Sequence, residues 1–158
     1  MKGSKITRLL AMTMVAGFLF GSLTAFAQGD IRSKIKLVVD KNPDIKKIGV
    51  YFNKDQVSAD QIPNLVGSAA IIKVPLASLR DVSQALNQVL NNYEIQAVFL
   101  VDDGKKLVTN SRTVKYFVKM GLKKNFMTFS DAETLDVKVS GRIAMRDGKL
   151  GLELADDQ

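Results

Sequence analysis

Apolar residues follow two alternating spacings along most of the chain. Residues 30–41, 79–91 and 113–120 carry apolar side chains three or four positions apart, which predicts amphipathic helices. Another helix is expected from Ser58 through Val66, with Ser58 as its cap and Pro63 in its first turns. Short apolar runs, typical of strands covered on both faces, lie between them at residues 48–52, 70–74, 95–101 and 126–129.

Polar residues and glycines predict the ends of these helices. Ser78 and Asp81 have the spacing of a capping box at the start of the helix over residues 79–91. Ser111 is expected to cap the helix over residues 113–120, and Gly121 is expected to terminate it. These signals divide the chain into alternating helices and strands.

The chain closes with a predicted β-hairpin. Residues 142–145 and 150–154 flank Asp147-Gly148, a dipeptide typical of a two-residue turn. Right-handed crossovers between the preceding strands would build a mainly parallel sheet with helices on both sides. The sequence therefore predicts one α/β domain over residues 28–158: a three-layer Rossmann-like or flavodoxin-like fold with a C-terminal antiparallel hairpin.

The first 27 residues have the pattern of a cleavable signal peptide. A basic start precedes an uncharged apolar stretch, and Ala25-Phe26-Ala27 then supplies small residues for cleavage before Gln28. The alternative is a retained membrane anchor, since residues 9–27 are almost long enough to cross a bilayer. We expect export to the periplasm, with membrane contact only through the signal segment.

Composition narrows the possible chemistry. The chain has no histidine and no cysteine, which removes the commonest general base and the usual ligands of zinc and haem. Three of its 23 basic residues and none of its 16 acidic residues lie in the signal, so the net charge falls from +7 to +4 on cleavage. The remaining lysines are scattered and do not form a stripe, so nucleic acid is not an expected partner.

Polar residues are expected to gather beyond the carboxyl ends of the strands, where open α/β sheets bind ligands. The candidate ligand-binding residues there are Asn53, Asp55, Ser58, Asp102, Asp103, Ser130 and Asp131. They suit a small polar ligand. The alternative is ordinary turn and cap chemistry, because Asn, Asp and Ser are common in turns for backbone reasons.

The sequence argues against an enzyme. It contains no glycine-rich nucleotide loop and no G-x-S-x-G elbow, and a serine nucleophile would have no histidine as its base. We expect no catalytic residues, no metal site and no cofactor.

The hairpin offers a second kind of site. Its outer strand has the character of an unprotected edge, so Leu150, Leu152 and Leu154 are candidates for pairing with a protein partner or with a second copy of the chain. The alternative is an edge blunted by Arg142, Arg146 and Glu153. Which hairpin strand lies outermost is left open by the sequence.

The C-terminal third resembles YfiR-type periplasmic domains. The resemblance rests on Thr128-Phe129-Ser130-Asp131, on Ser140-Gly141-Arg142-Ile143 and on the closing hairpin. The cysteines of the protein after which the family is named are absent, and Arg142 stands where a second glycine is common in the family. The resemblance implies a Rossmann-like, non-enzymatic regulatory or sensory domain that acts through a protein partner in the envelope or inner membrane, or as a homodimer.

A second resemblance gives a different expectation. Residues 44–53 are similar to the opening strand of one lobe of the substrate-binding proteins of ABC transporters, and residues 95–101 are similar to a later strand. This implies a solute-binding domain, although those proteins close two lobes on a ligand and this chain has the length of one. A subunit of a cell-envelope assembly is the third hypothesis.

Overall fold

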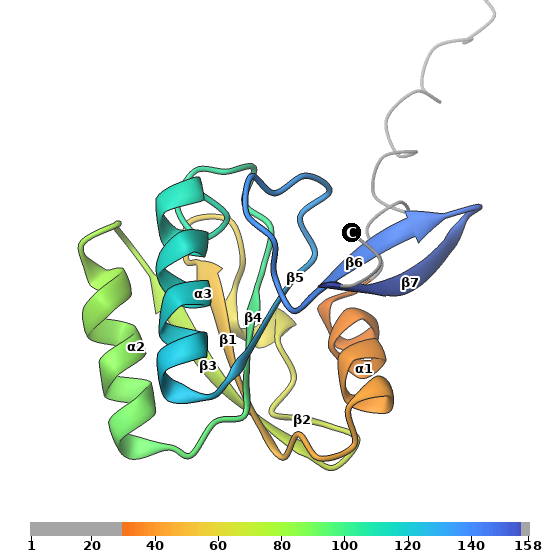
Figure 1. Ribbon diagram of the computed structural model, residues 1–158, viewed down its shortest axis with the longest axis horizontal. Coiled ribbons are helices and arrows are strands. Elements are labelled where there is room, and N and C mark those ends of the chain that lie inside the picture. Colours follow the sequence, from red (N-terminus) through yellow and green to blue (C-terminus); the bar gives the residue numbers. More distant parts are fainter. Residues whose placement is uncertain (1–29, 156–158) are drawn as a thin grey trace, which may run out of the picture.

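A computed structural model describes residues 30–155 (Figure 1). The proposed signal peptide and the alternative anchor lie outside these residues. The helices are α1 (Ile31–Lys41), α2 (Asp81–Asn92) and α3 (Ser111–Lys124), with a 3₁₀ helix η1 (Ala59–Gln61). The strands are β1 (Lys47–Asn53), β2 (Leu65–Val66), β3 (Ala69–Leu76), β4 (Ala97–Leu100), β5 (Met127–Ser130), β6 (Gly141–Arg146) and β7 (Lys149–Leu154).

The strands form one sheet in the order β2-β3-β1-β4-β5-β6-β7. The five strands from β3 to β6 run parallel, while β2 and β7 pair antiparallel at the two ends. Numbered in chain order, the parallel strands lie 2-1-3-4-5, which is the order of flavodoxin-like folds. The predicted fold class is therefore confirmed, including the C-terminal hairpin.

Helices cover both faces of the sheet, with α1 on one face and α2 and α3 on the other (Figure 1). The central strand β1 serves both cores: Ile48, Val50 and Phe52 pack in the core of α1, and Tyr51 packs in that of α2 and α3. Burial on both faces explains why β1 has the sequence of a continuous apolar run and not an alternating one.

Tyr51 is the one polar side chain in the middle of that run. Its ring meets Phe117 of α3 edge to face, with ring centroids 4.6 Å apart. Burial, with a smaller contribution from Tyr116, raises the pKa of the Tyr51 hydroxyl well above its usual value. The neutral phenol therefore behaves as a large packing residue between the sheet and α3.

The helix expected from Ser58 to Val66 is wrong. Ser58 does cap a helical turn, in a capping box with Gln61, but that turn is the short η1. Ile62 is extended, with φ −100° and ψ 122°, because the residue before a proline is driven out of the α region. After Pro63 the chain forms β2, and Gly67 at φ +57° turns it into β3.

Three helix ends also differ from the expectation. α2 begins at Asp81 after Arg80, without a side-chain cap, so the capping box expected at Ser78 and Asp81 does not form. α3 is capped by Asn110 and not by Ser111, and it continues past Gly121 to a left-handed Asn125. A Cβ at Gly121 would lie 2.6 Å from the carbonyl oxygen of Phe126, so glycine lets the helix approach the start of β5.

The hairpin forms as predicted, with β7 as the outermost strand of the sheet. Asp147 and Gly148 both have positive φ, 50° and 74°, as a two-residue turn of the right twist requires. This turn fixes the register, in which Arg142 lies opposite Glu153.

Candidate functional site

Two adjoining clefts lie beyond the carboxyl ends of the parallel strands. The chain leaves β1 for β3 on one side and later returns to β4 on the other side of β1, so the strand order reverses between β1 and β4. A cleft of about 400 Å³ lies at this reversal, between the start of α1 and the segments after β1 and β4. A larger cleft of about 650 Å³ continues from it toward the β6–β7 hairpin. Both are lined by Lys34, Asp102 and Asp131.

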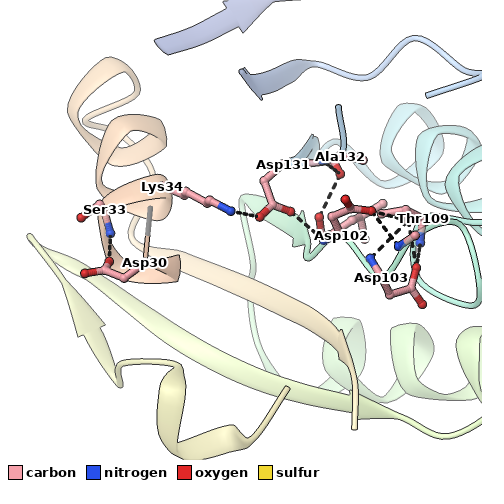
Figure 2. A network of polar contacts seen from close by, with 11 residues as sticks. Asp30, Ser33, Lys34, Asp102, Asp103, Thr109, Asp131 and Ala132 are labelled. Carbon is pink, nitrogen blue, oxygen red and sulfur yellow. Dashed lines mark hydrogen bonds and ion pairs between the residues drawn. The ribbon is translucent and has the colours of Figure 1, made fainter. Parts of the chain in front are cut away.

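A buried ion pair stands where the clefts meet (Figure 2). The Lys34 Nζ atom of α1 lies 2.5 Å from Asp131 Oδ2, and the two side chains are 8% and 3% exposed. The other oxygen of Asp131 accepts a hydrogen bond from the backbone N–H of Asp102, at 2.6 Å. One carboxylate thus ties α1 to the ends of β4 and β5.

The neighbouring Asp103 has a different environment, since its residue is 3% exposed and turned into the 103–109 loop. Its carboxylate accepts backbone N–H bonds from Leu107, Val108 and Thr109 and a hydroxyl bond from Thr109, at 2.7 to 3.1 Å. Burial favours the neutral acid, but these bonds outweigh it and hold the pKa of Asp103 below its usual value. Asp103 organises the loop and lines neither cleft.

The predicted residues after β1 also bond to their own chain. The Asn53 amide donates to Asp103 at 3.3 Å, and its oxygen accepts from the N–H of Asp55 at 3.1 Å. Ser58 is engaged in the cap of η1. None of these three lines either of the two clefts.

Ser130 is fully buried at the end of β5. Its hydroxyl donates to the carbonyl of Leu100 at 2.9 Å and accepts from the N–H of Ala132 at 3.2 Å. Of the seven predicted ligand-binding residues, Asp102 and Asp131 thus line the clefts. The other five line neither cleft and take part in hydrogen bonds within loops, a helix cap or the sheet.

Several cleft residues were missed at the sequence level. Lys34 precedes Val38 by four positions and so lies on the apolar face of α1; a lysine in such a place is the signal that would have identified it. Arg142, Arg146 and Glu153 line the large cleft from the hairpin. The Asp147-Gly148 turn already implies that Arg142 lies opposite Glu153, so this group was accessible from the sequence.

The hairpin residues form a second charged group. Arg142 and Arg146 donate to the two oxygens of Glu153 at 2.7 and 2.6 Å. The bond from Arg142, together with that from Arg146, outweighs desolvation and lowers the pKa of Glu153. Arg142 also donates to the backbone carbonyl of Glu133, which joins the hairpin to the loop after β5.

The outer strand β7 carries the predicted partner edge. Leu150 and Leu152 are half-buried and pack against the core beneath α1. Leu154 is 43% exposed, and Met145 in β6 is 49% exposed. In the described residues no strand pairs with the outer side of β7.

Comparison with known proteins adds the fold alone. No family model matches the chain, and no curated protein matches it. A solved structure of a conserved domain protein from Vibrio cholerae O1 biovar El Tor strain N16961 is similar, with a TM-score of 0.55 at 13% identity. The match covers 71% of this chain and 38% of that one.

The described residues lack two further features. Within residues 30–155, no helix is both long enough and apolar enough to cross a membrane. The same residues contain no group of three or more acidic side chains arranged to hold a metal ion.

Proposed function

We propose that the protein is a periplasmic, non-catalytic regulatory or sensory domain that acts through a protein partner, as YfiR-type domains do, and that it also binds a small polar ligand. One observation carries this proposal: the β6–β7 hairpin is both a wall of the large cleft and the free edge of the sheet. A ligand in the cleft would therefore touch the element that presents the edge to a partner.

The position and size of the clefts support ligand binding. Ligands of open α/β sheets bind where the strand order reverses, and the smaller cleft lies at that point. The volume of the larger cleft, about 650 Å³, falls within the range of small-molecule sites.

The lining of the clefts supports binding without catalysis. Neither cleft is lined by a serine, threonine or tyrosine among the described residues, and the sequence has no cysteine or histidine. The Asp131 and Glu153 carboxylates are held in ion pairs. In the described residues this lining therefore lacks a hydroxyl or thiol nucleophile and a histidine base, which are the commonest groups of nucleophilic and general-base catalysis.

Thermal unfolding of the purified protein against metabolites, nucleotides and peptidoglycan fragments tests the ligand half of the proposal. A compound at a hundred times its dissociation constant should add about 2.7 kcal/mol of stability and raise the midpoint by roughly 10 °C. Ala144→Gln, which narrows the large cleft without removing a charge, should abolish that rise. Asp136→Asn, in a neighbouring exposed loop, is the matched control and should retain it.

A flat panel, or a rise that survives Ala144→Gln, would contradict the assignment of the cleft. Recovery of enzymatic turnover would contradict the non-catalytic role.

Strand addition at β7 is the favoured way of recruiting the partner. In an antiparallel ladder every second residue turns its backbone groups away from the neighbouring strand. Counted from the two-residue turn, these are Leu150, Leu152 and Leu154 on β7. An extended segment of an envelope protein, or β7 of a second copy, would pair with them.

A proline scan of β7 tests this mode of recruitment. Leu152→Pro removes an outward N–H together with the packing of the Leu152 side chain, whereas Leu152→Ala removes the packing alone. Leu152→Pro should abolish capture of a partner from the inner-membrane fraction, or dimer formation in sedimentation, and Leu152→Ala should retain it. Gly151→Pro removes an inward N–H and should lower stability instead. Partner capture unchanged by Leu152→Pro would contradict strand addition.

A further inference from the structure

Two cationic side chains on the large cleft, those of buried Lys34 and half-buried Arg142, have hydrogen-bond donors without partners in the described residues. An ammonium group carries three donors, and within residues 30–155 that of Lys34 makes a single bond, to Asp131. The Arg142 Nε atom is buried and makes no hydrogen bond in the same residues. Unmet buried donors are costly, so the cleft is suited to an occupant that brings acceptor oxygens.

The same cleft also offers acceptors without cationic partners. Asp131 and Glu153 are held by Lys34, Arg142 and Arg146. In the described residues, the carboxylates of Asp102 and Glu133 form no ion pair, although both residues line the cleft. A purely anionic ligand would be repelled by these two groups, and a purely cationic one would leave the donors unmet.

The rest of the wall is apolar and comes from the hairpin, with Ile143, Ala144, Met145 and Leu150. Resting on the proposed function, the geometry points to a free α-amino acid with an apolar side chain as the ligand. Its carboxylate meets Lys34 and Arg142, its ammonium meets Asp102 and Glu133, and its side chain lies on the hairpin.

Three matched probes test this ligand class by calorimetry. L-leucine carries both charges, 4-methylpentanoate lacks the ammonium, and 3-methylbutylamine lacks the carboxylate. Hydrogen bonds to charged groups predict that leucine binds at least about tenfold more tightly than either analogue. Leucine that fails to bind, or binds no more tightly than 4-methylpentanoate, would overturn the inference.

Two variants locate the charge recognition. Asp102→Asn keeps the shape of the side chain and should reduce leucine affinity to that of 4-methylpentanoate, while the affinity for 4-methylpentanoate stays unchanged or increases. Asp136→Asn should change neither affinity. An equal loss for both probes in Asp102→Asn would mean a general disturbance of the cleft and would also overturn the assignment.

The outcomes separate this inference from the function on which it rests. If Ala144→Gln blocks binding of a compound of the broad panel while leucine does not bind, the proposed sensory function is supported and the amino-acid ligand is contradicted. If no compound binds in the cleft, both the ligand-binding function and the amino-acid ligand are contradicted.

Discussion

Asp102 and Asp103 are neighbours in the sequence with opposite roles in the fold. Asp103 turns inward, and its two oxygens accept bonds from three backbone N–H groups, a threonine hydroxyl and the Asn53 amide. Asp102 lines both clefts, and among residues 30–155 its side chain accepts from Gly104 and Thr109 through Oδ1 only. A fully satisfied carboxylate fixes a loop, whereas a partly satisfied one in a cleft is available to a ligand.

The same contrast divides the lysines of α1. Lys34 is buried against Asp131, while Lys36 forms an ion pair with Asp40 in which both side chains are more than half exposed. Lys34→Met should lower the free energy of unfolding by about 3–5 kcal/mol, because it leaves the Asp131 carboxylate buried without its cation. Lys36→Met should change it by no more than about 0.5 kcal/mol. Urea unfolding of both variants measures the difference, and equal losses would show that the burial of Lys34 has no energetic consequence.

Exchanging each aspartate for asparagine tests the two roles directly. Asp103→Asn places an amide NH₂ among backbone donors and should cost about 2–3 kcal/mol in the free energy of unfolding. Asp102→Asn keeps an acceptor for Gly104 and Thr109 and should cost less than about 1 kcal/mol. The comparison fails if the ranking is reversed in urea unfolding.

The pH dependence of stability gives the smallest effect. Because the pKa of Asp103 is lower in the folded protein than in the unfolded chain, its stabilisation is complete above the unfolded value of about 3.9 and is lost as the pH falls through the folded value. The stability gap between the wild type and Asp103→Asn should therefore narrow from pH 7 to pH 3. Glu153 shifts in the same direction and is present in both proteins, so it does not affect the gap. A constant gap would contradict the lowered pKa.

Local patterns were enough to predict most of the fold. Each of these patterns is contained within a few residues: the apolar spacing of α1, the continuous apolar run of β1 and the Asp147-Gly148 turn. Such elements can therefore be predicted without knowing which distant segments they contact. The segment from Ser58 to Val66 was mistaken because the conformation imposed on Ile62 by Pro63 ends the helix after one turn, and pairing with β3 then decides the rest.

The sequence predicted a candidate site at the carboxyl edge of the sheet, but it did not predict which residues line the clefts there. The carboxyl edge follows from the strand order, whereas the direction of each side chain depends on contacts between distant segments. Asp103 and Ser130 were indistinguishable in sequence from cleft residues until Leu107, Val108 and Leu100 were seen to take up their polar atoms. The partner of Lys34 could not be predicted, because Asp131 follows β5 and lies 97 residues further along the chain.

The pair of Lys34 and Asp131 also bears on how long the folded state lasts. Its members are 97 residues apart in the sequence, and because closing so long a loop costs entropy we expect the pair to form late in folding. An interaction formed that late contributes little to the rate of folding and acts mainly on the rate of unfolding. The ion pair between α1 and the residue after β5 is therefore expected to slow unfolding. Its removal should raise the unfolding rates in a chevron plot and leave the refolding rates unchanged.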